Sequence, residues 1–284
     1  MSLKKSEAQL EIISLAEAVA DEYCAKGKID PCKILDAEKI GYGYGNYGDT
    51  FDGMLEFKDS KYYVYANLDR LSRPSSVRTR FTFGHELGHY YIDEHRIAIE
   101  NGVGQHQSLC GMFDRSQCNE EREADLFAAN LLMPPSRVIE FLGKHQKLTP
   151  LKQIQLMAAH FDSSITSSAL QFIALSSAPT AAISWRPSGE SAWVKLADEF
   201  RLDDTMKFWS KPKFQRAAEA PRDSASSIVL RGEEDCSSNA TLASYIFANV
   251  KQGGHRDILL TEECMALGDY GALTIISKNS EVAI

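Results

Sequence analysis

Two histidines that stand four residues apart, His85 and His89, constrain the fold of this chain more than any other feature. The run around them, residues 77–92, supplies helix formers and apolar residues at helical spacing, so the sequence predicts a helix through both histidines. Residues four apart on a helix lie one turn above another, so both imidazoles point to one side and can hold one ion. The alternative is a buried helix whose histidines only pack in the core.

Glu86 follows the first histidine and completes the pattern His85-Glu86-Leu87-Gly88-His89. This HExxH pattern is typical of zinc hydrolases, in which the glutamate accepts a proton from water and does not bind the metal. The metal lowers the pKa of water enough for hydrolysis at neutral pH. Three fixed letters also arise by chance, so the pattern needs a third metal ligand elsewhere in the chain to indicate a site.

Three residues compete for the place of the third ligand: His95, Glu121 and Glu123. His95 follows His89 by six residues, which is the spacing of one class of zinc peptidases, but that class has a glycine where this chain has Ile92. If the helix instead continued, six residues would place His95 off the ligand side. We therefore do not favour His95.

A second helix is predicted to begin at a cap formed by Asn119 and to end before Pro134. Glu121 and Asp125 lie four apart on one side of it. We favour Glu121 as the third ligand, because zinc that carries two neutral imidazoles needs an anionic ligand. Asp125 is then placed to accept the remaining N–H of a ligand histidine. Glu123 points to a different side and lacks Asp125 as a partner.

Composition limits the class of protein. The 284 residues are enough for two or three domains. No apolar run is long enough to span a membrane or to act as a secretion signal, so we expect a cytoplasmic protein without membrane contact. The six scattered cysteines are expected to be free thiols. The net charge of -8 disfavours nucleic-acid binding over the whole surface.

Before the histidine pair, the pattern predicts an amphipathic helix over residues 6–25, a second short helical piece and a small antiparallel sheet over residues 40–68. Either Ser75 or Ser76 is expected to cap the histidine helix. Residues 101–118 indicate a long loop.

The second half of the chain predicts three helical pieces over residues 136–177 and an α+β domain over residues 178–284. Four residues in that domain are candidates to line a ligand pocket, although ordinary core or surface placement explains each of them: Trp185, Cys236, His255 and Cys264. Strand-like runs occupy residues 181–185, 227–232, 257–262 and 272–278, and a helical stretch occupies residues 240–250.

The two motif segments, RTRFTFGHELGHYYI and EEREADLFAANLLMP, resemble the ImmA/IrrE family of metallopeptidases. The family pattern R-x-R-F-T-x-x-H-E-x-G-H matches from Arg78 to His89. The pattern E-x-E-A-x-x-F-A-x-x-L-L-M-P matches from Glu121 to Pro134. The resemblance covers about the first half of the chain.

The resemblance implies an α+β fold with a mainly helical, zincin-like peptidase domain over residues 1–135. It carries the zinc ligands over to His85, His89 and Glu121, and the general base to Glu86. A helical segment that resembles a helix-turn-helix unit would follow the peptidase domain. The C-terminal domain would then be a candidate sensor or substrate-recognition domain.

Members of this family act in bacteria and in their mobile elements, and several cleave a helix-turn-helix repressor, which releases genes for stress response or element transfer. The resemblance thus implies a zinc-dependent endopeptidase that cuts a regulatory protein such as a transcriptional repressor. The residues that would stabilise the oxyanion are not fixed by the sequence, with Tyr90, Tyr91 and His106 as candidates.

Two other functions are compatible with the sequence. One is a non-catalytic regulator that binds a ligand or a partner protein on a peptidase scaffold. The other is a DNA-binding transcriptional regulator that uses the helix-turn-helix-like segment. The expected recognition helix, residues 165–175, has no Lys or Arg, so we expect it to pack against the peptidase domain and direct nucleic-acid binding to be absent.

Overall fold

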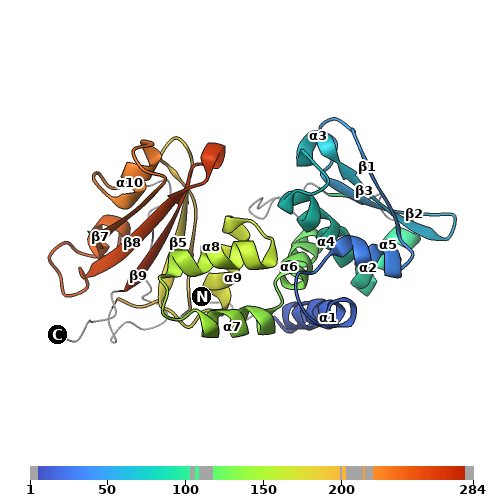
Figure 1. Ribbon diagram of the computed structural model, residues 1–284, viewed down its shortest axis with the longest axis horizontal. Coiled ribbons are helices and arrows are strands. Elements are labelled where there is room, and N and C mark those ends of the chain that lie inside the picture. The colour runs from blue at the N-terminus through green and yellow to red at the C-terminus, as the bar shows by residue number, and fades with distance from the viewer. Residues whose placement is uncertain are drawn as a thin grey trace. The chain divides into compact units, whose positions relative to one another are not determined.

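The computed structural model describes residues 6–102, 106–108, 118–198, 200–202, 214 and 220–278, and of residues 106–108 the backbone alone (Figure 1). The chain divides into two compact units. The N-terminal unit comprises Leu3–Glu140 and Met157–Ser167; the C-terminal unit comprises Phe141–Leu156 and Ser168–Ile284, together with Met1–Ser2.

The N-terminal unit opens with α1 (Glu7–Tyr23), close to the predicted bounds. Ser6 and Gln9 form a capping box, in which each side chain accepts a hydrogen bond from the other residue's backbone N–H. The second helix, α2 (Pro31–Ala37), begins with proline at its first position, and the side chain of Asp30 caps it.

The sheet of the N-terminal unit has, among the described residues, the strand order β1-β3-β2-β4. Strands β2 and β3 form an antiparallel hairpin whose turn, Asp59-Ser60, has positive φ at both residues. The predicted antiparallel arrangement needs correction for β1, which pairs in parallel with β3. Because β4 occupies the other edge of β2, β1 takes the open edge of β3. The strands are β1 (Gly41–Gly45), β2 (Gly53–Lys58), β3 (Lys61–Asn67) and β4 (His106–Ser108).

The short helix α3 (Leu68–Leu71) leads from the sheet to the histidine helix, α4 (Val77–Tyr91). Ser76 caps α4, since its Oγ accepts a hydrogen bond from the backbone of Thr79. Helix α5 (Asp93–Glu100) follows almost at once. The predicted loop over residues 101–118 contains β4, and its residues 103–105 and 109–117 lie outside the described part of the chain.

The second motif helix is α6 (Asn119–Leu132), which ends before Pro134 as predicted. The predicted cap at Asn119 is wrong. Cys118 is the N-cap residue and makes no side-chain capping bond. Asn119 is the first helical residue, and its Nδ2 donates to Glu123 Oε1 at 2.5 Å, so this side chain serves another side chain instead of the helix backbone.

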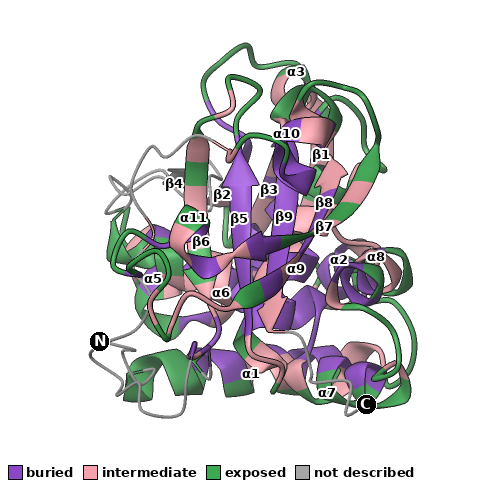
Figure 2. Ribbon diagram, turned by 90° about the vertical axis from the view of Figure 1, so that its left-hand side faces the viewer, coloured by how far each residue is buried: buried purple, intermediate pink, exposed green. Residues whose placement is uncertain are grey.

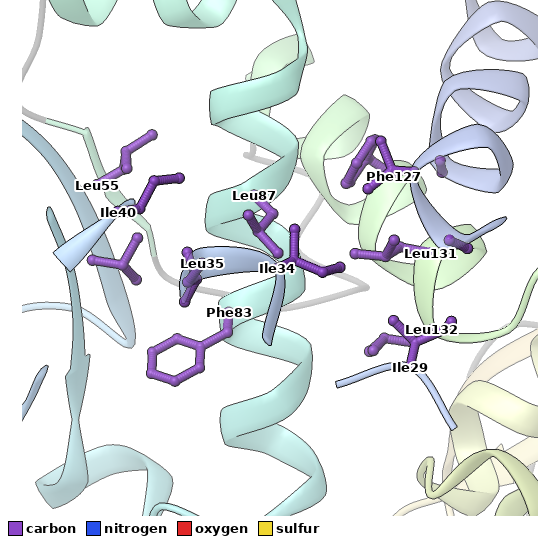
Figure 3. Packing of buried hydrophobic residues seen from close by; sticks show 14 of the residues in the cluster. Ile29, Ile34, Leu35, Ile40, Leu55, Phe83, Leu87, Phe127, Leu131 and Leu132 are labelled. Carbon is purple, nitrogen blue, oxygen red and sulfur yellow. The ribbon is translucent and has the colours of Figure 1, made fainter. Parts of the chain in front are cut away.

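The core of the N-terminal unit packs around α4 (Figure 3). Phe83 and Leu87 of α4 are almost completely buried, as are Phe127 and Leu131 of α6. Leu55 of β2 belongs to the same cluster, which joins the sheet to both motif helices. This apolar packing fixes α4 and α6 beside each other, so that their polar residues are set within a rigid frame.

Residues 135–175 form the predicted three helices, which are α7 (Pro135–Lys144), α8 (Pro150–Phe161) and α9 (Ile165–Leu175). Five residues of α9 are buried, namely Ser168, Ala169, Gln171, Phe172 and Ile173.

The part of the C-terminal unit that the structure describes contains an antiparallel sheet in the order β6-β5-β9-β8-β7. Every residue of β5 is buried, which Figure 2 shows as a continuous purple strand. The predicted α+β fold is confirmed. The strands are β5 (Thr180–Trp185), β6 (Ser191–Leu196), β7 (Cys236–Leu242), β8 (Leu259–Ala266) and β9 (Ala272–Lys278).

Three predictions in this unit need correction. The strand-like residues 227–232 lie mostly in a helix, α10 (Ala225–Leu230), because Ser224 caps it and its apolar residues pack on β8. The predicted helix over residues 240–250 is reduced to one turn, α11 (Ala243–Ile246). The sequence pattern also missed β6. A short 3-10 turn at Gly268–Tyr270 joins β8 to β9.

Two of the four candidate pocket residues of this unit, Trp185 and Cys236, line different cavities. Trp185 lines a small cavity beside Glu262, whereas Cys236 lines an open groove. Cys264 is buried in the sheet, and His255 is exposed.

The described cysteines, Cys24, Cys32, Cys118, Cys236 and Cys264, are free thiols as predicted, and Cys110 lies outside the described residues. Among the helices that the structure describes, none combines the length and the apolar content needed to cross a bilayer.

A buried carboxylate holds α10 on the sheet of the C-terminal unit. Glu262 of β8 is 1% exposed, and its Oε1 accepts hydrogen bonds from the backbone N of Ser226 at 2.8 Å and from the Ser226 hydroxyl. The same hydroxyl lies 2.7 Å from Thr274 Oγ1, to which the Trp185 indole donates at 2.8 Å. The network thus joins α10, β8, β9 and β5.

We expect Glu262→Ala to lower the unfolding free energy of the C-terminal unit by about 2–3 kcal/mol, because it leaves the buried donors of Ser226 without their acceptor. Glu262→Gln keeps an acceptor oxygen and should cost less. Urea-induced unfolding followed by tryptophan fluorescence measures both, with the exposed Glu234→Ala as the matched control. Equal stability of Glu262→Ala and Glu234→Ala would contradict this role.

Candidate metal centre

Helix α4 directs both histidines into the interior of the N-terminal unit. His85 and His89 are each 0% exposed. Their Nε2 atoms lie 3.0 Å apart, so the two rings converge on one point, as the four-residue spacing predicts.

Helix α6 brings a carboxylate to the same point. Glu121 Oε2 lies 3.3 Å from His85 Nε2, and Glu121 Oε1 lies 3.4 Å from His89 Nε2. One ligand atom from each of the three residues falls within 4.8 Å of the others, and all three residues are buried. The structure therefore brings together the predicted set, and the His85-His89-Glu121 cluster could hold a metal ion.

Four small residues allow α4 and α6 to approach this closely. A Cβ atom on Gly88 would lie 3.0 Å from Ala124 Cα and 3.1 Å from its carbonyl oxygen. One turn earlier, a Cβ on Gly84 would lie 3.4 Å from Ala128 Cβ. The sequence carries a signal for this contact in the four-residue spacing of Gly84 and Gly88 on one helix and of Ala124 and Ala128 on the other. Without it, Glu121 would stand further from the histidines.

Asp125 lies where the sequence placed it, one turn after Glu121. Its Oδ1 is 2.9 Å from His85 Nδ1. A carboxylate at this distance accepts the Nδ1–H and leaves the Nε2 lone pair directed at the cluster. Asp125 is therefore placed where it would hold the His85 ring in the tautomer and orientation that metal binding requires.

His95 and Glu123, the two candidates that were not favoured as ligands, contact each other. His95 Nε2 lies 3.1 Å from Glu123 Oε2, and His95 Nδ1 lies 3.1 Å from His89 Nδ1. Neither residue belongs to the His85-His89-Glu121 cluster. The contact between Glu123 and His95 was not predicted from the sequence.

His95 reaches His89 because of the way in which α4 ends. A turn at this point was expected to need a glycine, but the helix ends at Tyr91 and the chain turns at Ile92 with φ -79° and ψ 111°. Any residue can adopt this extended conformation. The turn starts α5 and carries His95 back to His89.

The catalytic candidate Glu86 is buried under the first residue of β2. A Cβ on Gly53 would lie 2.6 Å from Glu86 Oε1 and 2.4 Å from Thr82 Cγ2. The preceding residue, Asp52, is fully buried, and it binds Arg70 Nε at 2.6 Å and Arg78 Nη2 at 2.9 Å.

These two arginine contacts fix the start of β2 against α4. The sequence singled out Arg78 only as part of a motif and gave no signal for Asp52 or Gly53, since their role depends on a contact between distant segments.

Two of the oxyanion candidates are engaged elsewhere. Tyr90 and Tyr91 donate hydrogen bonds to Glu38, the residue that caps the C-terminus of α2, at 3.0 Å and 2.8 Å, and the Tyr23 hydroxyl donates to the same carboxylate. Burial raises the pKa of Tyr91, as do its bonds to Tyr23 and Glu38. Burial also acts to raise the pKa of Glu38, but the three hydroxyl bonds lower it further than burial raises it.

Tyr90 and Tyr91 are therefore structural links between α4, α2 and α1, and their hydroxyls are not directed at a substrate. The side chain of the third candidate, His106, lies outside the described residues.

The close helix contact leads to a testable prediction. We expect Gly88→Ala to lower the unfolding free energy by about 1–3 kcal/mol, because the new Cβ meets the backbone of Ala124. The variant should also bind a divalent metal ion more weakly, since Glu121 moves away with α6. The matched control is Gly143→Ala in α7, where a Cβ meets nothing within 4 Å, so this change should stabilise by about 0.4–1 kcal/mol. Thermal unfolding and metal titration measure both effects, and a stabilised Gly88→Ala would show that the helix contact is looser.

Comparison with known proteins assigns the motif region. Residues 71–165 match peptidase family M78, described as the IrrE N-terminal-like domain. No curated protein matches the sequence. Among solved structures, a Mycobacterium tuberculosis transcriptional regulator shares the fold with a TM-score of 0.55 and 12% identity, over 94% of this chain and 76% of that chain. The matched region contains α4 and α6 with the His85-His89-Glu121 cluster, so this part of the chain is similar to the peptidase-like IrrE N-terminal domain.

Proposed function

We propose that this protein is a zinc-dependent endopeptidase. The observation that carries the proposal is the convergence of two imidazoles and one carboxylate in the buried His85-His89-Glu121 cluster, with Glu86 directly after the first histidine. The match of residues 71–165 to a peptidase family supports the same function.

The donor set fits zinc. Two neutral imidazole nitrogens and one carboxylate are the ligands of many catalytic zinc sites, which leave a further position open for water or substrate. Zinc would supply a Lewis acid that polarises the scissile carbonyl and activates water. His85, His89 and Glu121 would hold it, and Asp125 would keep His85 in the required tautomer.

Glu86 would act as the general base. Its burial keeps the carboxylate in a fixed place beside the cluster, and the absence of a side chain on Gly53 leaves room for it. The carboxylate would take a proton from the attacking water and pass it to the amine that leaves when the peptide bond breaks.

The proposed substrate is a regulatory protein, such as a helix-turn-helix transcriptional repressor. The family resemblance supports this class of substrate, and the solved structure with a similar fold is itself named a transcriptional regulator. The C-terminal unit would then recognise the substrate or a signal.

That same name supports an alternative, in which the chain is a non-catalytic regulator on a peptidase scaffold. A DNA-binding role has less support, because α9 has five buried residues and neither Lys nor Arg. A parent protein that binds zinc but leaves both a peptide library and the proteins of a bacterial extract intact would favour the non-catalytic alternative.

Glu86→Gln tests the proposed base. The substitution keeps the size of the side chain but removes its ability to accept a proton, so cleavage of a fluorogenic peptide library should fall by about 10²–10⁴-fold. Zinc affinity should change little, because Glu86 is not a proposed ligand. A variant that cuts as fast as the parent would rule out this mechanism.

Gly53→Ala tests the placement of the base. The new Cβ would lie 2.6 Å from Glu86 Oε1, so the carboxylate must move. We expect cleavage to fall by about 10²-fold while zinc binding persists, because a shift of about 1 Å in a catalytic group is enough for such a loss. Gly43→Ala in β1 is the matched control, since a Cβ there meets nothing within 4 Å. Equal activity of the two variants would contradict the proposed contact.

A further inference from the structure

We propose that His95 and Glu123 position His89 as a metal ligand, with His95 as a bridge between the ligand and the carboxylate. The inference rests on the proposed zinc site. This proposal gives a role to His95 and Glu123, which lie outside the His85-His89-Glu121 cluster.

The contacts form an unbroken chain that leads away from the cluster. His89 Nδ1 lies 3.1 Å from His95 Nδ1, and His95 Nε2 lies 3.1 Å from Glu123 Oε2. Glu123 Oε1 in turn accepts a hydrogen bond from Asn119 Nδ2 at 2.5 Å. His95 is only 5% exposed, so its ring is held within the unit.

Metal binding by His89 dictates where each proton lies. The Nε2 of His89 faces the cluster, so in the ligand state it offers its lone pair and Nδ1 carries the proton. His95 Nδ1 must then accept that N–H, which leaves the His95 proton on Nε2. This Nε2–H donates to Glu123. When both rings are neutral, one arrangement satisfies these two contacts, and it is the arrangement in which His89 can bind a metal.

Glu123 selects this arrangement. If its carboxylate were removed, the neutral His95 ring could carry its proton on Nδ1 instead, where it would oppose the Nδ1–H of His89. This state would push His89 toward the tautomer whose Nε2 is protonated and cannot bind the ion.

The two ligand histidines are thus held in different ways. Asp125 contacts His85 directly, at 2.9 Å, whereas the carboxylate that serves His89 acts through a neutral ring. Helix α6 supplies Glu121, Glu123 and Asp125, so one helix provides the anionic ligand and both supporting carboxylates. The bridge through His95 lets Glu123, on another side of α6, reach a ligand that it does not touch.

The test measures zinc affinity by competition with a chelator in the parent, His95→Leu and Glu123→Leu. Both variants should bind zinc about 10–100-fold more weakly, the usual cost of removing such a partner. His95→Asn should recover part of the affinity, because its amide oxygen can accept the His89 N–H. Glu94→Leu, at an exposed neighbour of His95, is the matched control and should bind as the parent does.

Two further readouts separate positioning from a general effect on folding. The metal-free variants should keep the melting temperature of the metal-free parent to within a few degrees, and the visible absorption of the Co²⁺-substituted protein should change in His95→Leu. The double variant His95→Leu/Glu123→Leu should lose no more zinc affinity than His95→Leu alone, because the residues act in one chain.

Parent-like zinc affinity and Co²⁺ absorption in His95→Leu would overturn the inference, as would losses in the double variant that simply add. These results differ from a failure of the proposed function itself, in which the parent protein binds no zinc. Loss of peptide cleavage in Glu86→Gln without any effect of His95→Leu would retain the peptidase and reject the bridge.

Discussion

The close contact between α4 and α6 is the interaction on which the site depends. Gly84 and Gly88 of α4 meet Ala124 and Ala128 of α6, and the lack of larger side chains lets the two backbones come together. The small residues of this contact lie four apart on each helix, and so do His85 and His89. The two histidines therefore face the turn of α6 that carries Glu121. The apolar cluster below the contact keeps this alignment rigid.

This alignment places groups together that would repel one another without a cation. Once Asp125 takes the Nδ1–H of His85, the Nε2 atom offers a lone pair, and the Glu121 carboxylate offers only acceptor atoms. Burial of several acceptors at one point is unfavourable unless a positive charge lies between them. A proton can serve two of them, whereas a divalent metal ion can serve all three, which is why the cluster fits a metal better than a core of hydrogen bonds.

The sequence predicted those parts of the site that depend on helical spacing. On each of the two helices the site residues lie four apart, and caps and apolar spacing predict both helices. The sequence therefore predicted that these four side chains come together: His85, His89, Glu121 and Asp125. His95 lies outside the cluster, as expected, but its contact with His89 was not predicted, because an extended residue at position 92 turns the chain and many residue types can adopt that conformation. The roles of Gly53 and of α10 depend on contacts with segments far along the chain, which composition and periodicity do not record.

The two units use buried carboxylates for different ends, and the partner decides which. Glu262 Oε1 accepts hydrogen bonds from a backbone N–H and a hydroxyl, groups that are neutral and fixed, and so ties α10 to the sheet of the C-terminal unit. Glu121 faces the Nε2 atoms of two imidazoles, and together these side chains form a set of donor atoms that could hold a metal ion. The first carboxylate therefore joins elements of the fold, whereas the second belongs to a cluster suited to an ion. A metal ion bound there would add its binding free energy to the stability of the N-terminal unit.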